Sequence, residues 1–148
     1  MSHLRGIFIF GVKMNNILEM QKDLQSKLHV KNQAIKSIEN ISTLGEKCDA
    51  LMYNKNAFDY EFKEVLEALS ASEDPSSLWK NWKQKYNETR SKLYTDLTDS
   101  QKRELQMEFV DMFCFFLNMM LVLEIDTETL FSLYKEKYKI NLNRIKDY

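Results

Sequence analysis

The sequence has few of the residues that interrupt regular structure. Its 148 residues include only 3 glycines and 1 proline, Pro75, and both residue types mark turns and loops. Leu, Lys, Glu and Met, which favour helices, are plentiful instead. The sequence therefore predicts an all-α bundle of about five to six long helices joined by short polar loops.

Cysteine and histidine are also scarce. Cys48 and Cys114 are too few for the disulfide framework of a small secreted protein, so we expect a reducing, cytoplasmic location. The two histidines, His3 and His29, do not form the Glu-x-x-His pairs that a di-iron carboxylate bundle needs on each of two helices. No Cys/His zinc pattern or glycine-rich phosphate loop is present either.

The chain has neither a large net charge nor an apolar run long enough to cross a membrane. Its net charge is −1, which gives no general field for attracting nucleic acid or an anionic membrane. The most apolar run, residues 109–123, is shorter than the roughly 20 residues that span a bilayer, and it contains Asp111. We expect no nucleic-acid partner and no membrane segment, and interpret the run as a core helix buried on nearly every side.

Apolar residues at helical spacing locate the expected helices. Asp99 or Ser100 is expected to cap the central helix and Asp126 or Thr127 the last one. The expected helices are residues 15–29, 32–53, 57–70, 78–94, 99–125 and a last helix from about residue 127 nearly to the end. Residues 1–13 are expected to be an upstream start or a disordered extension, and residues 14–148 a single domain.

Two pairs of acidic residues lie three positions apart on the expected helices: Glu61 with Glu64, and Glu108 with Asp111. This spacing puts both carboxylates of a pair on one helical face. If the two helices pack side by side, four carboxylates converge and require bound cations or protonation. Oxygen ligands without His or Cys suit Mg²⁺, or Mn²⁺ in its place.

Each acidic pair also has an interpretation without function. Glu61 and Glu64 alone are typical of a solvated helix face. Asp111 interrupts an apolar helix, and a buried carboxylate must be paired, hydrogen-bonded or metal-bound. A functional and a structural role both remain open for Asp111. Glu104, one turn before Glu108, either extends the cluster or faces solvent.

Two further stretches combine cations with polar or aromatic residues. Lys137, Asn141 and Arg144 fall on one helical stripe that can hold a polyphosphate, although a solvated face is the commoner outcome. In the segment LWKNWKQKY, the two tryptophans favour packing in a core, while their neighbouring lysines have the length to reach phosphate. These residues are Trp79, Lys80, Trp82 and Lys83.

Taken in order, several segments resemble the all-α dimeric dUTPase family, and within it the dCTPase/dUTPase branch of T-even-type phages, in the wider MazG-like pyrophosphatase superfamily. The segments are MQKDLQSKL, EFKEVLEAL, LWKNWKQKY, ELQMEFVDMFCFFLN and LYKEKYKINLNRIKDY. The resemblance implies a helical homodimer, with tetramers as the alternative. It also implies Mg²⁺-dependent hydrolysis of dUTP, dCTP or both to the monophosphate and pyrophosphate.

The resemblance implies roles for individual residues. Metal ligands that are also catalytic would be Glu61, Glu64, Glu108 and Asp111. Phosphate and sugar contacts would be Lys80, Lys83, Asn118, Lys137, Asn141 and Arg144, with Trp79 and Trp82 in the pocket. Gln21 and Gln25 would face the base. An amide both donates and accepts, so glutamine can serve the uracil oxygen or the cytosine amino group.

Two other functions stay open at this stage. One is a MazG-like pyrophosphatase that acts on another or a modified nucleotide. The other is a non-catalytic helical interaction protein, in which the apolar faces form a dimer interface and the acidic residues only solubilise it. The second function predicts that neither Mg²⁺ nor nucleotide changes the protein's stability.

Overall fold

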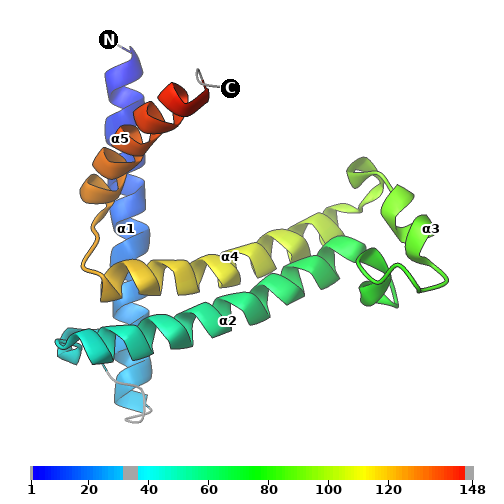
Figure 1. Ribbon diagram of the computed structural model, residues 1–148, viewed down its shortest axis with the longest axis horizontal. Helices are drawn as coiled ribbons and strands as arrows, with labels where there is room; N and C mark the ends of the chain where they lie inside the picture. The colour runs from blue at the N-terminus through cyan, green and yellow to red at the C-terminus, as the bar shows by residue number, and fades with distance from the viewer. Residues whose placement is uncertain (1, 32–36, 146–148) are drawn as a thin grey trace. The chain divides into compact units, whose positions relative to one another are not determined.

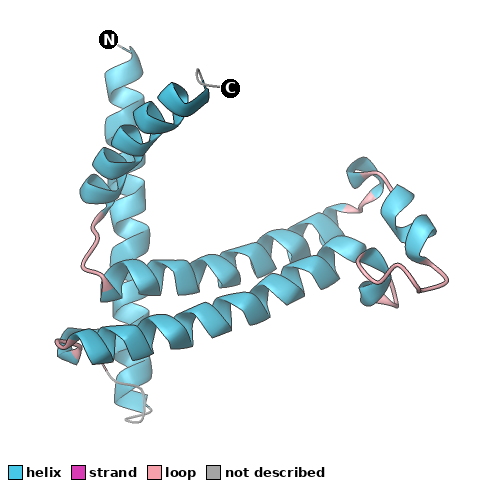
Figure 2. Cartoon of the chain, in the orientation of Figure 1, coloured by secondary structure: helices cyan, strands magenta, loops and turns pink. Residues whose placement is uncertain are grey.

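The computed structural model describes residues 2–31 and 37–145. Within these ranges the chain consists of helices and loops without a strand, which confirms the all-α prediction (Figure 2). The described elements, with 3-10 helices written η, are α1 (Ser2–Lys31), η1 (Ile38–Asn40), α2 (Leu44–Ser70), η2 (Pro75–Leu78), α3 (Tyr86–Ser91), η3 (Tyr94–Asp96), α4 (Asp99–Val122) and α5 (Thr127–Ile145) (Figure 1).

The helices belong to two compact units. The first unit combines Met1–Ala50 with Leu117–Tyr148, and the second is the continuous segment Leu51–Phe116. In the first unit α1 packs against α5, and the Thr127 hydroxyl donates a hydrogen bond to the side-chain oxygen of Asn15. The apolar core of this unit consists of Leu18, Leu117, Met120 and Val122.

Side-chain caps set where the long helices begin. At the start of α2, Glu46 N–H donates to Thr43 Oγ1 while Glu46 Oε2 accepts from Thr43 N–H, a reciprocal capping box. Thr98 and Gln101 make the same exchange at the start of α4, so the predicted caps Asp99 and Ser100 are wrong by one or two positions. The predicted cap Asp126 is confirmed for α5.

At α5, the Asp126 carboxylate accepts a hydrogen bond from Thr129 N–H at 2.7 Å. This bond favours the charged carboxylate and holds the pKa of Asp126 below its ordinary value. The negative charge also lies at the positive end of the helix dipole. Asp126 therefore both satisfies an open backbone donor and complements the helix electrostatically.

The end of α4 is closed by a left-handed residue and a lysine from α2. Glu124 has φ of 57°, and Ile125 N–H donates to Met120 O at 2.9 Å, as in a Schellman turn. Lys47 Nζ donates to Val122 O at 2.7 Å and lies 3.1 Å from the Glu124 carboxylate. A cation thus satisfies a carbonyl that has no partner within the helix.

Three of the predicted helices, 32–53, 57–70 and 78–94, differ from the observed ones, and α2 begins only at Leu44. The predicted start at residue 32 lies outside the described residues, and the predicted break between residues 53 and 57 is absent because no glycine or proline interrupts α2 there. The predicted helix 78–94 is wrong. Pro75 begins a 3-10 turn, further turns follow, and only Tyr86–Ser91 is α-helical. The Ser77 and Thr89 hydroxyls, both buried, join these pieces at 2.7 Å.

Burial also differs from the prediction. In residues 109–123 the second half is buried around Leu117 and Val122, but Phe109 is 53 % exposed and Asp111 is exposed too. The expectation of a helix buried on nearly every side is therefore wrong for the single chain, because burial depends on what packs against a face as well as on its apolarity.

Of the described helices, α4 has the length and composition to cross a membrane, and 28 % of its most apolar window is buried. Length and composition are weak evidence, because core helices of soluble proteins pass the same test. The acidic residues Glu104, Glu108 and Asp111 in α4 are a stronger indication of its role.

Candidate functional site

An acidic cluster lies between two helices of the second unit. There the residues 51–70 of α2 and 99–116 of α4 run side by side in opposite directions (Figure 1). Glu61 and Glu64 from α2 meet Glu108 from α4, and one carboxylate oxygen of each lies within 4.8 Å of the others. The spacing of three residues puts Glu61 and Glu64 on the face of α2 that is turned toward α4.

Mutual repulsion and partial burial perturb the acidic cluster. Burial raises the pKa of Glu61, and the charges of Glu64, Asp111 and Glu108 raise it further. Burial likewise raises the pKa of Glu108, followed by the charges of Glu64, Asp111 and Glu104. A hydrogen bond to Glu64 contributes to both shifts. Without a counter-ion, protons are thus held at a site where three carboxylates converge.

Asp111 lies beside the cluster rather than within it. Its charge acts on both Glu61 and Glu108, but its side chain is exposed and it is not one of the three converging carboxylates. The prediction that Asp111 is a buried carboxylate is wrong for the single chain. Glu104 is exposed and is not one of the converging carboxylates either, although its charge helps to raise the pKa of Glu108.

The donors present fit a hard divalent cation. The three converging side chains offer only carboxylate oxygens, which Mg²⁺ and Mn²⁺ prefer. Cys114 is the soft donor nearby; burial raises its pKa, and the charge of Asp111 adds to that shift, so its thiol stays protonated. The site therefore matches an oxygen-ligated cation better than zinc or copper.

The tryptophan and lysine segment of the second unit lies in turns instead of a helix. Trp82 is 76 % exposed, which contradicts the prediction that it packs in a core. Lys83 forms an ion pair with Asp74 at 3.2 Å. The pKa of Asp74 is lowered by the hydrogen bond from the Ser76 hydroxyl and then by Lys83. Trp79 and Lys80 lie in the same turns.

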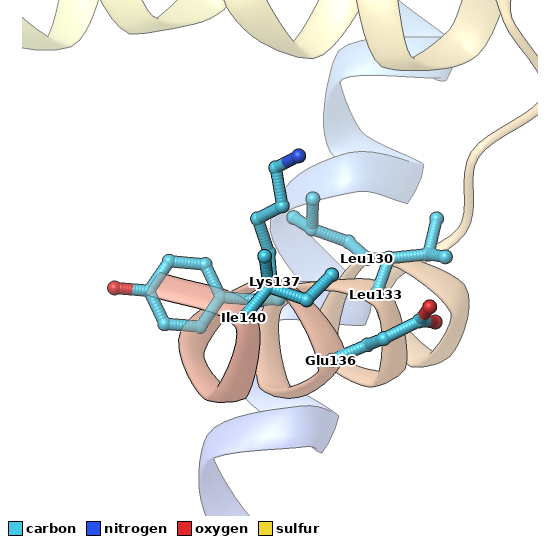
Figure 3. A pocket seen from close by; sticks show the side chains of 6 residues that line it. Leu130, Leu133, Glu136, Lys137 and Ile140 are labelled. Atoms are coloured by element: carbon cyan, nitrogen blue, oxygen red, sulfur yellow. The ribbon is translucent and has the colours of Figure 1, made fainter. Parts of the chain in front are cut away.

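The basic stripe lies on α5, in the first unit. Lys137, Asn141 and Arg144 are all exposed. A shallow depression of about 390 Å³ runs along α5 beside Lys137, and the Lys137 ammonium projects away from the helix (Figure 3). The other lining residues are Leu130, Leu133, Tyr134, Glu136 and Ile140. The depression is apolar apart from Glu136, Lys137 and the tyrosine hydroxyl.

Gln21, which was predicted to face the base, and Asn118, which was predicted to contact phosphate or sugar, lie side by side in the first unit. Gln21 Nε2 donates to Asn118 Oδ1 at 2.8 Å, and both side chains are buried. Gln25, one turn after Gln21, is half-buried. No signal in the sequence pairs Gln21 with Asn118, because they are 97 residues apart. The burial of Gln21, by contrast, has a signal in the sequence. Leu18 lies three residues earlier on the same face of the helix and is buried as well.

Known proteins similar to this chain come from bacteriophages. The dCTP pyrophosphatase of Enterobacteria phage T4 is 31 % identical over 132 residues, covering 86 % of this chain and 77 % of the phage protein. The dCTP pyrophosphatase of Enterobacteria phage LZ5 is 32 % identical over 136 residues, with the same two coverages. A DNA replication protein of phage T4 is 31 % identical over 131 residues, but the match covers 33 % of that longer protein. No family model and no solved structure matches the chain.

Proposed function

The chain belongs to the family of the phage dCTP pyrophosphatases, and from this membership and its acidic cluster we propose that it hydrolyses dCTP, dUTP or both, with Mg²⁺, to the deoxynucleoside monophosphate and pyrophosphate. The observation that carries the proposal is the convergence of Glu61, Glu64 and Glu108 within 4.8 Å. A divalent cation reduces the electrostatic repulsion between these carboxylates. A triphosphate is also negatively charged and binds divalent cations, so the same ion can neutralise both.

Under this proposal the three glutamates hold Mg²⁺, with Asp111 as the fourth ligand. The ion supplies charge neutralisation to the phosphates and makes a water molecule more acidic. Glu61 and Glu108, whose pKa values are raised, release their protons when they bind the cation. Glu61 or Glu64 would orient the attacking water and accept its proton. The water oxygen bonds to the β-phosphorus, the bond from that phosphorus to the oxygen bridging the α-phosphorus breaks, and the deoxynucleoside monophosphate leaves while the other two phosphates form pyrophosphate.

The remaining predicted residues take part in holding the nucleotide. Their chemistry supports this: the cations and amides donate hydrogen bonds to phosphate and sugar oxygens, and the glutamines can pair with a base edge. The exposure of Trp82 and of the α5 stripe leaves them accessible to a ligand. The proposed residues are Lys80, Lys83, Asn118, Lys137, Asn141 and Arg144 for phosphate and sugar, Trp79 and Trp82 for the pocket, and Gln21 and Gln25 for the base.

We also propose that the protein is a homodimer that works in the nucleotide pool of the cytoplasm. Exposed apolar side chains on α2 and α4 of the second unit support the dimer, because an association partner is what removes such large apolar side chains from water. These side chains are Phe62, Met107, Phe109, Val110 and Phe116. A second copy would remove them from water at a gain of roughly 25 cal/mol per Å² of apolar area.

The test is pyrophosphate release by the full chain from dCTP, dUTP, dTTP, dATP, dGTP and UTP, with Mg²⁺ and with chelator. We expect turnover of dCTP, dUTP or both that chelator abolishes. Turnover of a different or modified nucleotide would replace the substrate assignment by a broader pyrophosphatase. Absence of turnover, with no effect of Mg²⁺ or nucleotide on stability, would favour an interaction protein.

A comparison of Glu64 with Glu67, both on α2, tests whether Glu64 acts as a metal ligand. Glu64→Gln keeps the side-chain size but removes a charge from the cluster, and we expect activity to fall at least a hundredfold, the order of loss for a group that acts in catalysis. Glu67→Gln is the matched control, because Glu67 pairs with Lys63 at 3.4 Å on the surface. Equal activity of the two variants would remove the metal-site assignment.

A further inference from the structure

Three side-chain donors act on the Asp74 carboxylate, in the turns that follow α2. One carboxylate oxygen accepts a hydrogen bond from the Ser76 hydroxyl at 2.9 Å, and the other lies 3.2 Å from the Lys83 ammonium. The hydrogen bond from Ser76 lowers the pKa of Asp74 most, Lys83 lowers it next, and the charge of Lys80 adds to the shift. A hydroxyl and two ammonium groups therefore favour a negative charge at this place.

Backbone hydrogen bonds hold these donors together without help from the Asp74 side chain. Ser77 N–H donates to Asp74 O at 3.0 Å. Lys80 N–H donates to Ser76 O at 2.9 Å, and Lys83 N–H donates to Lys80 O at 3.0 Å. In this described part of the chain, the Asp74 carboxylate makes no capping hydrogen bond to η2. The arrangement of the donors is thus expected to persist when another anion takes the place of the carboxylate.

The same donors suit a phosphate oxygen. Carboxylate and phosphate oxygens both accept hydrogen bonds from hydroxyl and ammonium groups, and charged partners make the stronger bonds. A lysine ammonium has three N–H donors, so Lys83 can turn from Asp74 to another anion while it stays in the turns. The side chains of Lys83 and Asp74 are 37 % and 40 % exposed. A ligand can therefore reach this ion pair from solvent, and so exposed a pair is weak enough to be exchanged.

We propose that Asp74 competes with the nucleotide: its carboxylate occupies an anion site formed by Ser76, Lys80 and Lys83 until a phosphate group of the triphosphate displaces it. This inference rests on the proposed function, in which the two lysines contact phosphate. It adds Ser76 as a third phosphate donor and makes Asp74 an inhibitory contact within the turns. When phosphate enters, the Ser76 hydroxyl and the Lys83 ammonium exchange one acceptor for another, and the Asp74 carboxylate turns to water.

The opposite role, in which Asp74 holds Lys83 in position for phosphate, is less compatible with the charges. An anchored lysine loses less side-chain entropy when a ligand binds, which favours binding. A carboxylate that stays on Lys83, however, offsets the charge of the ammonium and repels every negative charge of a triphosphate nearby. Because the triphosphate carries several such charges and the anchoring pair is partly exposed, repulsion outweighs the gain from anchoring.

The test measures the dissociation constant of inorganic tripolyphosphate for the full chain, with chelator, by isothermal titration calorimetry. Tripolyphosphate has no base and nothing for the enzyme to release as a nucleoside, so the result does not depend on the proposed hydrolysis. Asp74→Asn keeps the side-chain size and removes the charge. We expect the dissociation constant to fall by about twofold to fivefold, the range that a partly exposed ion pair accounts for. Asp74→Ser should give the same result, since serine is also well tolerated where a helix begins.

Asp59→Asn is the matched control. Asp59 pairs with Lys55 on the surface of α2, so its replacement removes the same charge and releases a lysine outside the turns. We expect it to leave tripolyphosphate binding unchanged. Ser76→Ala, added to Asp74→Asn, should cancel the tighter binding because phosphate loses the hydroxyl donor.

The outcomes separate this inference from the proposed function. Unchanged binding in Asp74→Asn, or the weaker binding that a positioning role requires, would overturn the inference, and so would equally tighter binding in Asp59→Asn. Tighter binding that survives Ser76→Ala would remove Ser76 from the site. With Mg²⁺, the KM for dCTP should also fall in Asp74→Asn while kcat stays the same. Failure of the unaltered chain to hydrolyse any nucleotide would reject the proposed function, whatever the tripolyphosphate measurements give.

Discussion

Two residues other than glycine have a left-handed backbone: Ala71, with φ of 43°, and Glu124, with φ of 57°. Each follows a long helix, at the position where glycine is most common. A side chain with a β-carbon pays roughly 1–2 kcal/mol in this conformation. The ion pair of Glu124 with Lys47 offsets part of that energetic cost. Ala71 makes its contact to Lys92 only through its backbone oxygen.

Replacing Ala71 by glycine is therefore expected to stabilise the protein. Relief of the left-handed strain exceeds the extra entropy of glycine in the unfolded chain, so we expect the free energy of unfolding to rise by about 0.5–1 kcal/mol. Ala68→Gly, one turn earlier inside α2, is the matched control and should lower it by a similar amount. Chemical denaturation measures both. A loss of stability in Ala71→Gly would contradict the prediction.

The acidic cluster makes stability depend on pH and on Mg²⁺ together. The pKa values of Glu61 and Glu108 are raised in the folded chain above the ordinary value of 4.5. The folded state thus binds protons more tightly than the unfolded state, and this contribution to stability is lost as pH rises through the raised values. We expect the metal-free protein to lose stability as pH rises above about 4.5 through this range.

Mg²⁺ should reverse that loss, because it binds the deprotonated carboxylates. The increase in melting temperature on adding Mg²⁺ is therefore expected to be large near neutral pH and small near pH 4.5. Thermal unfolding with Mg²⁺ and with chelator measures it at both pH values. In Glu61→Gln the increase should shrink. An increase that does not change with pH would place the cation elsewhere.

Sequence spacing was sufficient to bring part of the site together. The three-residue interval of Glu61 and Glu64 dictates a shared helical face whatever the rest of the chain does. The exposure of Asp111 could not be read in the same way, since it depends on which surface packs against that face of α4. The hydrogen bond between Gln21 and Asn118 joins distant parts of the chain, and no local pattern encodes such a pairing.

At the scale of elements, the helix ends rest on a few side chains. The Thr43 and Glu46 exchange satisfies backbone groups that α2 cannot satisfy internally. Thr43→Ala removes the hydroxyl, and we expect the free energy of unfolding to fall by about 1 kcal/mol. Thr43→Ser keeps the hydroxyl and should retain most of the stability. Equal losses in both variants would assign the effect to packing of the methyl group.

Helices were predictable where periodicity and caps agree. The break after α2, the central helix and the last helix all follow from local signals, namely Pro75, Asp126 and the apolar repeat of α4. The segment 78–94 has a helical composition but is held in turns by the pair of Ser77 with Thr89 and by Lys83 with Asp74. Tertiary contacts of this kind override weak helix propensity.

At the scale of the whole molecule, the exposed apolar side chains of α2 and α4 lead to a prediction about assembly. Light scattering after size exclusion should give the mass of two chains. Val110→Lys places a charge on the exposed apolar face and is expected to yield single chains, because a buried unpaired charge opposes association. Asn87→Lys is the control, because it adds the same charge at an exposed polar position of α3, outside the apolar face of α2 and α4. A monomer in the unsubstituted protein would contradict the dimer.

The first compact unit is discontinuous in sequence, since Met1–Ala50 is completed only by Leu117–Tyr148. During translation α1 therefore leaves the ribosome first. It can pack against α5 only after nearly the whole chain has been made. The intervening segment Leu51–Phe116 is continuous and is free to fold during that wait. A chain that ends after residue 116 and has been released from the ribosome would thus be able to form the acidic cluster, while Leu18 and Gln21 of α1 would still face water.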